Sequence, residues 1–549
     1  MAEVVGVTLR LAPARPFEIE ALARRLDEQP GELVSAARLE RLLAHEPEDL
    51  DALLAWATRH GLARVDGDAR RLRFAGTLAQ LRQAFGDAGL RALASRRAGA
   101  PAIASVDALP PRLRGMVARI ELSPGAPGPW GEALSLGDPP ELEAPLRPAR
   151  CGVTPAELER ALSVPRDTDG AGQRIAMMAL GGLPRARDLE VFAASFERPR
   201  ARPSFIALGP VSPQTRDDPL FRHETTMSVQ WIGALAPAAE LRVYVIDPRH
   251  VADPWVAFFE AALADHATIA TTAWSSPEQQ YYASHGRQIA ASLLDQLALR
   301  GCTVLAASGD WGPCAGAPRA RIAGDSSLGC ARPWPGVAFP CSEPRVLAVG
   351  GTMGLEQPEL LRAELSRDLA ERLGLREVSS GGGFSEQVAI PPWQAAALRS
   401  HYPRDAGAPA VLPSGRAVPD LALPAWAVPG LAGFGFCGLV DERWRDDIGG
   451  TSLSVALAAA CLARVNQALE ARGRPRMGCV GPRLYRTPGV LRPVERGTTS
   501  VELPCVDERG RLRWEVVPGF VATSGWDPGA GLGVPDFARL LERLEADWQ

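Results

Sequence analysis

Residues 449–452 (GGTS) stand directly before the apolar run 453–465 (LSVALAAACLARV). The run predicts a buried helix, and two glycines allow a sharp turn ahead of it. Such a turn places Ser452 at a helix N-terminus, where free N–H groups and the helix dipole favour developing negative charge. A serine held there can attack a carbonyl carbon, or it can simply cap the helix. Taken alone, the stretch fits the cap better.

Length and composition limit the function classes. A chain of 549 residues with 46% apolar residues predicts two or three domains with a large core. The net charge of −4 does not indicate a basic surface that would bind nucleic acid or an anionic membrane, so we expect neither as a partner. We also expect a monomer. The sequence shows no run long and apolar enough to span a bilayer. The N-terminal residues lack the pattern of a secretory signal, which predicts a cytoplasmic protein or export by another route.

The chain changes character twice. Residues 1–122 predict an α+β unit, with a strand at 4–11, helices at 17–25, 36–43, 50–59 and 78–85, and a hairpin at 63–74. Residues 123–150 are rich in proline and glycine and predict an exposed linker. From residue 151 onward strands alternate with helices, which predicts a mostly parallel, doubly wound α/β sheet with ligands beyond the strands' C-terminal ends. The expected strands are 174–180, 241–246, 268–272, 303–307 and 346–349, and the expected helices are 251–264, 287–299 and 537–546.

A serine nucleophile needs a base, and the seven histidines lie in no recognisable catalytic motif. The helix start that follows the first strands reads RHETTMSVQWIGALAP, at 222–237. Together with the GGTS stretch, this resembles the sedolisin (kumamolisin-type) serine-carboxyl peptidases. Further matches follow in the same order, at 306–310 (AASGD), 339–344 (FPCSEP), 349–352 (VGGT), 379–385 (SSGGGFS), 418–420 (VPD) and 525–533 (GWDPGAGLG). Residues 73–77 (RFAGT) and 84–86 (AFG) resemble the family's propeptide.

The resemblance implies a subtilisin-like fold and a role for three side chains. Ser452 matches the nucleophile, Glu224 the base, and Asp310 the donor to the oxyanion. A glutamate accepts a proton only while it is ionised, whereas an aspartate donates a hydrogen bond only while it is protonated. One carboxyl must therefore be charged while the other keeps its proton, which suits acidic solution.

Two positions of the catalytic region depart from the family pattern. The family has an aspartate four residues after the glutamate, and this chain has Ser228, whose hydroxyl can hold Glu224 but cannot share a proton as a carboxyl would. The substrate strand of the family reads Ser-x-Ser-Trp-Gly, and here it reads TTAWS, at 271–275. The resemblance implies substrate contacts from Ala273, Trp274, Ser275 and Gly309, although Trp274 can also be a core residue.

The family's calcium site is only partly present. Asp527 matches one of its aspartates, and the backbone carbonyls of Val494, Thr523 and Gly525 would complete it. The family's second aspartate falls at Pro493 in this chain. A hard cation binds less tightly where a charged oxygen ligand is missing. We therefore expect weak calcium binding at most.

The resemblance implies a zymogen with an inhibitory, ferredoxin-like prodomain at 1–122, a linker with the processing site at 123–150, and a peptidase domain at 151–549. The expected reaction is hydrolysis of a peptide or protein substrate through an acyl-enzyme, with activity weakened by Ser228; the prodomain is the expected intramolecular partner. One alternative is a pseudopeptidase that serves as a binding or scaffold protein. Another is a histidine-dependent enzyme, for which His223 is the one candidate.

Overall fold

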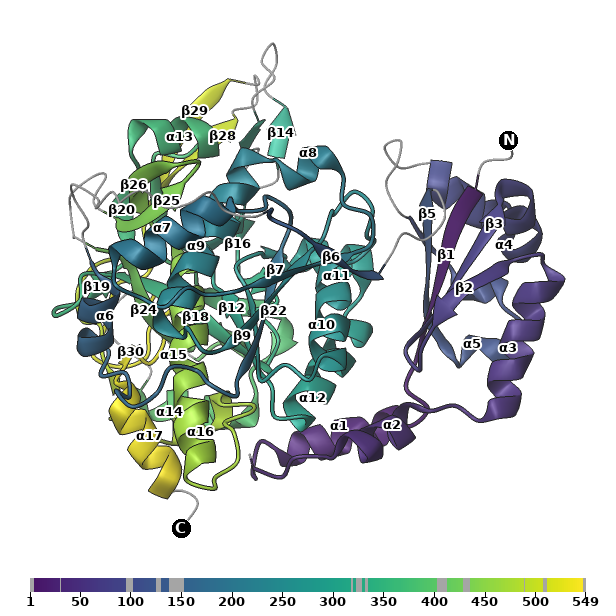
Figure 1. The fold of residues 1–549 in the computed structure, drawn as a ribbon, viewed down its shortest axis with the longest axis horizontal. Coiled ribbons are helices and arrows are strands. Elements are labelled where there is room, and N and C mark those ends of the chain that lie inside the picture. The colour runs from purple at the N-terminus through teal and green to yellow at the C-terminus, as the bar shows by residue number, and fades with distance from the viewer. Residues whose placement is uncertain are drawn as a thin grey trace.

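The computed structural model describes residues 4–29, 31–94, 102–124, 130–137, 153–316, 319–321, 328–330, 334–401, 412–427, 435–487, 489–506 and 511–546. A smaller antiparallel sheet with its helices lies beside a larger, mostly parallel sheet that helices cover (Figure 1). The architecture is the subtilisin-like α/β fold preceded by an α+β unit, as the sequence predicts.

The large sheet has the strand order β19-β18-β12-β10-β7-β9-β8-β6, with β24 paired to β18. Its central pairs are parallel, and β6 and β19 run antiparallel at the two edges. Five strands confirm the sequence prediction: β7 (Arg174–Ala179), β9 (Glu240–Val245), β10 (Ile269–Thr272), β12 (Thr303–Ala307) and β18 (Val346–Met353). The others are β6 (Trp130–Leu134), β8 (Ser204–Leu208), β19 (Glu359–Leu360) and β24 (Leu421–Trp426).

Helices α9 (Pro219–Leu235) and α15 (Thr451–Ala471) pack against one another on one face of this sheet. The small side chains of α15, many of them alanine, are buried and let the neighbouring elements approach closely. This helix corrects one expectation, because its length and composition would allow it to cross a membrane. Its apolar window is 89% buried inside the protein, which is what the central core helix of a folded domain shows.

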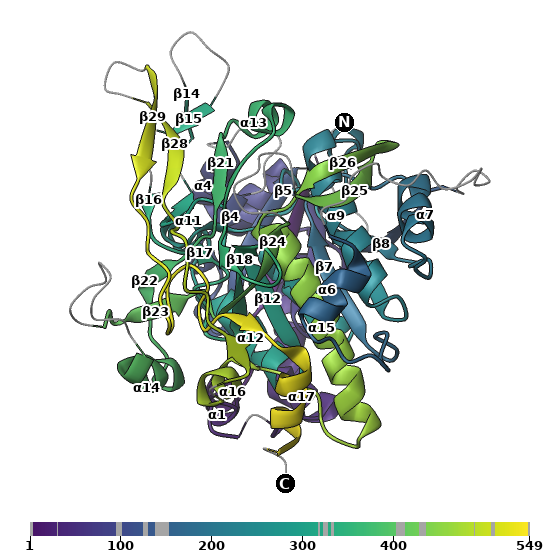
Figure 2. The same ribbon diagram turned by 90° about the vertical axis from the view of Figure 1, so that its left-hand side faces the viewer.

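Other helices cover the sheet or join its strands: α6 (Pro155–Ala161), α7 (Ala186–Ser195), α8 (Pro213–Arg216), α10 (Pro254–Ala264), α11 (Glu278–His285), α12 (Gln288–Leu299), α13 (Arg367–Leu373), α14 (Pro392–His401), α16 (Gly481–Arg486) and α17 (Phe537–Ala546). Small hairpins form the periphery: β22 (Gly383–Ala389) with β23 (Gly415–Val418), and β25 (Phe436–Val440) with β26 (Arg443–Ile448). The hairpin of β28 (Val501–Val506) and β29 (Leu512–Val517) stands out from the body of the protein (Figure 2).

The N-terminal sheet has the order β2-β3-β1-β5-β4 and only antiparallel neighbours. Its strands are β1 (Val4–Leu11), β2 (Ala63–Gly67), β3 (Arg71–Thr77), β4 (Ala102–Ala104) and β5 (Val117–Pro124), and its helices are α3 (Pro47–Arg59), α4 (Leu78–Ala94) and α5 (Pro111–Arg114). Alternate side chains of β1, such as Val7 and Leu9, are fully buried in a core of this unit's own. Thr77 caps α4, because Thr77 Oγ1 accepts the amide of Gln80 at 3.3 Å.

Helices α1 (Pro16–Arg25) and α2 (Ala36–Leu43) leave this unit and extend beneath the larger one (Figure 1). Their apolar side chains, among them Ile19, Leu22 and Leu39, join the core cluster that underlies α10 and α12. The amide of Val34 also donates to the carbonyl of Leu299 at 2.8 Å. The N-terminal segment is thus held partly by the core of the peptidase-like domain.

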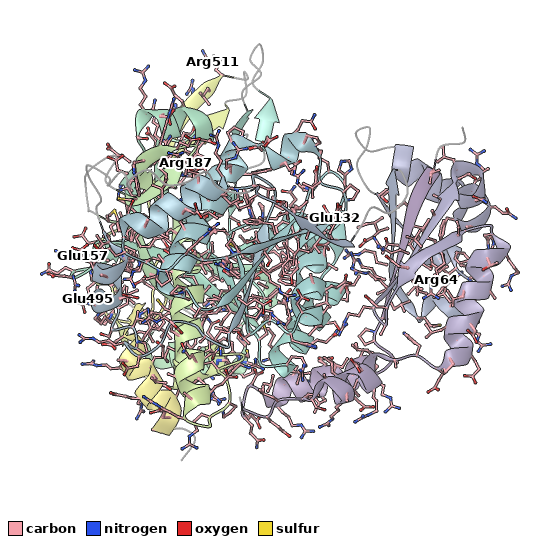
Figure 3. The ribbon with its side chains drawn as sticks, viewed as in Figure 1. Arg64, Glu132, Glu157, Arg187, Glu495 and Arg511 are labelled. Carbon is pink, nitrogen blue, oxygen red and sulfur yellow. The ribbon has the colours of Figure 1, made fainter. Side chains whose placement is uncertain are left out.

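Buried ion pairs join the two units directly. Arg10 pairs with Glu121 of its own sheet and with Glu260 of α10, and Arg71 also reaches Glu260, at 3.3 Å. Arg119 binds Asp253 at 2.7 Å. The chain contains no lysine, so every such cation is a guanidinium that can bind two acceptors at once. Many other charges point outward from the periphery (Figure 3).

The predicted linker differs from expectation at its centre. Residues 130–134 form β6, which pairs antiparallel with β8 at the edge of the large sheet. Edge pairing supplies backbone hydrogen bonds that proline and glycine content does not predict, since these bonds depend on a partner strand far along the chain. Residues 125–129 and 138–150 lie outside the described residues, so the processing site remains a prediction.

We predict that Glu260→Gln destabilises the full chain by about 3–5 kcal/mol, because two buried guanidiniums lose their shared anionic partner. Denaturant unfolding at neutral pH measures this change. Glu132→Gln, at an exposed position of β6, is the control and should change stability little. Equal stability of the two variants would contradict the proposed importance of the ion pairs at this interface.

Candidate active site

The first turn of α15 is shaped by the two glycines before it. Gly450 has φ = 85°, a left-handed conformation that favours glycine, and its amide donates to the carbonyl of Ala425 at 3.0 Å. A Cβ on Gly449 would lie 2.3 Å from the buried ring of Trp426. The turn therefore needs both glycines, and it places Ser452 in the first turn of the helix, as the sequence predicts.

Glu224 lies in the N-terminal half of α9, whose first amides are capped by Asp218. The side chain of Ser452 acts on the Glu224 carboxyl and lowers its pKa, against the larger effect of burial, which raises it. Ser228, one helical turn further along, donates to Glu224 Oε1 at 3.5 Å, the outer limit of a hydrogen bond. The packing of α9 on α15 thus brings the predicted nucleophile and the predicted base together.

Asp310 reaches the same place from the loop that follows β12. Its Oδ1 accepts two hydrogen bonds from Thr451, one from the amide at 2.8 Å and one from the hydroxyl at 3.0 Å. The Thr451 hydroxyl accepts in turn from the amide of Gly309 at 3.2 Å. Because Oδ1 is occupied as an acceptor, Oδ2 is the oxygen left to carry a proton. A Cβ on Gly450 would lie 2.7 Å from Oδ2, so only glycine lets Asp310 sit here.

The two carboxyl groups influence each other's protonation. Burial raises the pKa of Glu224 to about 8, and the negative charge of Asp310 adds to the rise. Burial also raises the pKa of Asp310, while its hydrogen bonds from Thr451 act in the opposite direction. Two coupled acids titrate as a pair, so the negative charge of either carboxyl favours the protonated form of the other.

The predicted substrate strand ends next to the catalytic pair. Ala273 and Trp274 line a small cavity that Glu224 and Ser228 also line. The ring of Trp274 packs edge-on against Phe221, with centroids 5.2 Å apart, and it is partly buried. The structure therefore gives Trp274 a packing contact as well as a place beside the site. Ser275, the next residue, is partly exposed, and Gly309 adjoins the site through Thr451.

The neighbouring histidine acts elsewhere. His223 is buried, and its positive form would lower the pKa of Asp447, on β26.

The residues at the predicted calcium site fit a cation poorly. Asp527 is buried, and burial raises its pKa to about 7. Its Oδ1 accepts the amides of Gly529 and Ala530 at 2.8 and 2.9 Å, and its Oδ2 accepts the amide of Thr523 at 3.4 Å. These bonds occupy the oxygens that a calcium ion would need. Across the described residues, no group of three or more His, Cys, Asp and Glu side chains is placed to hold a metal.

Some of the residues that form the site were not predicted. Thr451 and Gly450 stand in the quoted stretch, but their contacts with Asp310 join parts of the chain that are about 140 residues apart. The pattern Gly-Gly-Thr indicates a turn and a cap, but it does not identify Asp310 as the residue that the turn contacts.

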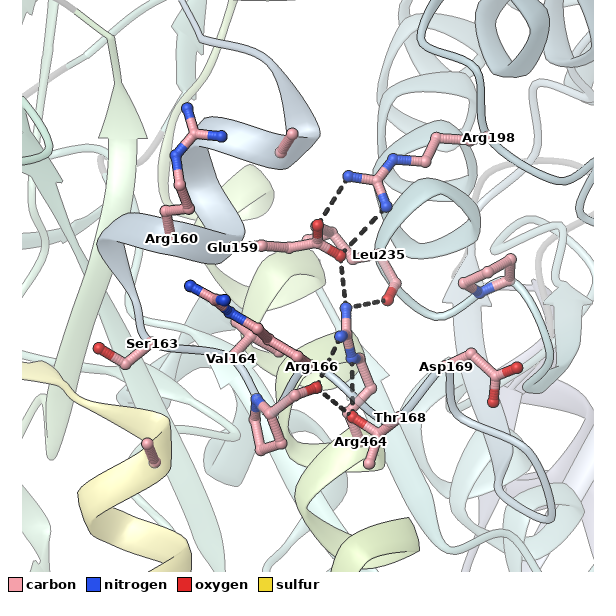
Figure 4. Close-up of a pocket in the computed structure, with 14 residues that line it drawn as sticks. Glu159, Arg160, Ser163, Val164, Arg166, Thr168, Asp169, Arg198, Leu235 and Arg464 are labelled. Carbon is pink, nitrogen blue, oxygen red and sulfur yellow. Dashed lines mark hydrogen bonds and ion pairs between the residues drawn. The ribbon is translucent and has the colours of Figure 1, made fainter.

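A larger hollow of about 810 Å³ lies near the C-terminal end of α9 (Figure 4). There Glu159 binds both Arg198 and Arg464, and Arg464 of α15 also donates to the carbonyl of Leu235 at the end of α9. These bonds fix α9 and α15 to each other far from Ser452. We assign this hollow a structural role.

No protein-family model matches the chain. Kumamolisin of Bacillus sp. (strain MN-32) is 30% identical over 396 residues, which are 71% of this chain and 63% of that protein. Human tripeptidyl-peptidase 1 is 29% identical over 334 residues, 58% of this chain and 51% of that protein. The chain thus spans less than two thirds of these relatives' length. The solved structure of Pseudomonas sedolisin in complex with pseudo-iodotyrostatin has a TM-score of 0.54 at 20% identity, covering 72% of this chain and 98% of that one, and it shows the same fold.

We predict that Glu224→Gln changes the pH dependence of stability. The pKa of Glu224 is higher in the folded state, at about 8, than its ordinary value of 4.5, so the wild-type chain loses stability as the pH rises from 4.5 to 8. The uncharged glutamine side chain of the variant removes this loss, which amounts to at most about 5 kcal/mol. Denaturant unfolding across that pH range measures it. Parallel stability curves for the two proteins would contradict the buried, coupled state of Glu224.

We predict that a calcium chelator leaves the thermal unfolding temperature unchanged, because Asp527 is already satisfied by backbone amides. Added calcium should likewise have no effect at millimolar concentration. The Asp527→Asn variant, which keeps the carbonyl acceptor, is the comparison. A chelator-induced fall of several degrees in the wild type alone would show a working cation site.

Proposed function

We propose that this chain, which belongs to the sedolisin, kumamolisin and tripeptidyl-peptidase family of serine-carboxyl peptidases, hydrolyses peptide bonds through an acyl-enzyme on Ser452. The observation that supports this best is that Asp310 is fixed on the N-terminus of α15 beside Ser452, whose side chain acts on Glu224 and lowers its pKa. A hydroxyl, a proton acceptor and an oxyanion donor thus meet at one point.

In the proposed reaction, Ser452 Oγ bonds to the carbonyl carbon of the substrate and its proton moves to Glu224. The carbonyl oxygen becomes an oxyanion, which accepts a hydrogen bond from protonated Asp310 and lies in the positive field of the α15 N-terminus. Glu224 then passes the proton to the leaving amine as the C–N bond breaks. Water, with Glu224 again as base, hydrolyses the acyl-enzyme and restores the serine.

The carboxyl pair gives the proposed reaction a pH range. The productive form carries one proton, on Asp310, and the hydrogen bond from Ser452 favours an ionised Glu224. In strong acid both groups are protonated and no base is available. At higher pH Asp310 loses its proton, and the oxyanion donor is lost. Activity should therefore be bell-shaped.

We further propose that the chain is a zymogen whose N-terminal unit is an intramolecular partner, on the support of the buried ion pairs and the α1–α2 contact with the peptidase-like core. Peptides or proteins are the substrate class that the family implies. One observation favours a weakened enzyme or a pseudopeptidase as the second candidate. Ser228 reaches Glu224 by a single 3.5 Å contact in place of the family's second carboxyl.

We predict that a peptide aldehyde at about pH 5–7 forms a covalent adduct on Ser452, which intact-protein mass spectrometry followed by peptide mapping detects. Ser452→Ala should lose the adduct. Ser454→Ala, in the same helix, should keep it, because that hydroxyl donates to the carbonyl of Leu423 at 2.9 Å and has no part in the site. Absence of any adduct on Ser452 across the acidic and neutral range would favour the pseudopeptidase.

We predict that Ser228→Asp raises kcat/KM for a peptide substrate at acidic pH by at least about tenfold, since a second carboxyl can orient Glu224 and share its proton. Ser228→Asn has the same shape but cannot share a proton, so it should give little increase. Equal rates for the wild type and both variants would mean that position 228 does not limit the reaction.

A further inference from the structure

A small cavity lies directly beside the predicted base. It is bounded by α9, α15, β7 and β10, and its walls include Glu224, Ser228 and Thr271 together with apolar side chains such as Met177 and Val455. The volume in which the centre of a water molecule can lie is about 10 Å³. That is the lower limit for one bound water, and the space is too small for a larger ligand.

Thr271 adds a buried hydroxyl to the wall of this cavity, and no contact among the described residues satisfies that hydroxyl. Its side chain is 2% exposed, and its Oγ1 has no hydrogen-bond partner. A buried hydroxyl without a partner costs about 1–3 kcal/mol, so a protein usually satisfies it. The next residue shows the contrast, because Thr272 Oγ1 contacts Met178 Sδ at 3.4 Å and accepts the amide of Trp274 at 3.0 Å.

Ser228 provides the second polar group of the wall. Its hydroxyl makes one long contact, 3.5 Å to Glu224 Oε1, although a hydroxyl can donate one hydrogen bond and accept two. Of the polar side chains in the wall, Thr225 already donates to the carbonyl of Gly181 at 2.9 Å. Thr271 and Ser228 supply hydroxyls with unused capacity, and Glu224 supplies a carboxyl, around a space of one water. Two to four polar partners are what a buried water molecule requires.

We propose that this cavity holds one ordered water molecule, bound by Thr271, Ser228 and Glu224, and that Thr271 is a positioning residue for Glu224. The water accepts a hydrogen bond from Thr271 and donates one to the Glu224 carboxylate. Glu224 thereby gains a second hydrogen bond beside the long contact from Ser228. The catalytic consequence rests on the proposed function; the water site itself does not.

The charged groups around Glu224 do not favour its ionised form, so neutral groups must do so. Asp310 is the charge that acts on Glu224, and it disfavours the ionised form. The next cation on α9, Arg222, binds Asp217 and Asp441 at 3.0 Å each, and His223 acts on Asp447. Hydrogen bonds from hydroxyls and from a bound water are thus the contacts that favour the ionised form of the base, against the effect of burial.

The test compares Thr271→Val with Thr352→Val. Both threonines are buried strand residues with an unpartnered hydroxyl, but Thr352 is on β18 and does not line this cavity. Thr271→Val should move the acid limb of the kcat/KM profile upward by about half a pH unit or more, because the ionised base loses support. Thr352→Val should keep the wild-type profile. Identical profiles for the wild type and both variants would overturn the positioning role.

A high-resolution crystal structure tests the water site without any activity. Density for a water bonded to Thr271 and Ser228 in the wild type, and its loss or displacement in Thr271→Val, is the expected result; an empty or collapsed cavity in the wild type overturns the proposal. An inactive wild type that still shows the water would refute the proposed function and leave the site standing. In a Ser228→Asp background the carboxyl should replace the water, and Thr271→Val should then have no effect on the pH profile.

Discussion

The arrangement of the site depends on how closely the Asp310 carboxyl can approach the first turn of α15. That approach is possible because residue 450 carries no side chain, and Thr451 then fixes the carboxyl with its amide and its hydroxyl. The same turn presents Ser452 to Glu224. A single short segment thus holds the proposed nucleophile, orients the proposed acid and leaves space for it, and it is continuous with the long buried part of α15.

The burial that makes such a site also sets its chemistry. Removing two carboxyls from water raises both pKa values, and their mutual repulsion keeps one proton on the pair. In the family a further carboxyl lies one turn along the base helix. In this chain a serine, a small cavity and a buried threonine hydroxyl stand in its place. The weaker support of Glu224 and the proposed water follow from that one exchange of residue type.

The N-terminal unit is fastened to the rest in two different ways. Guanidinium–carboxylate pairs such as Arg10–Glu260 and Arg119–Asp253 are buried at the contact. Removing one partner of such a pair costs the protein more stability than the intact pair contributes, because the remaining charge stays buried and unpaired. Helices α1 and α2 add apolar contacts with the core near α12.

The sequence by itself determined the local elements and the order of the motifs. Strands β7, β9, β10, β12 and β18, the helix after Ser452, and the likeness to a serine-carboxyl family all follow from hydrophobic periodicity and short patterns, which depend on neighbours in the chain. Tertiary structure alone decided that β6 joins the large sheet, that Thr451 holds Asp310, and that Thr271 faces Glu224 across a cavity. Each of these is a contact between distant segments. No local pattern encodes such a contact, because its energy depends on what the fold brings to the other side.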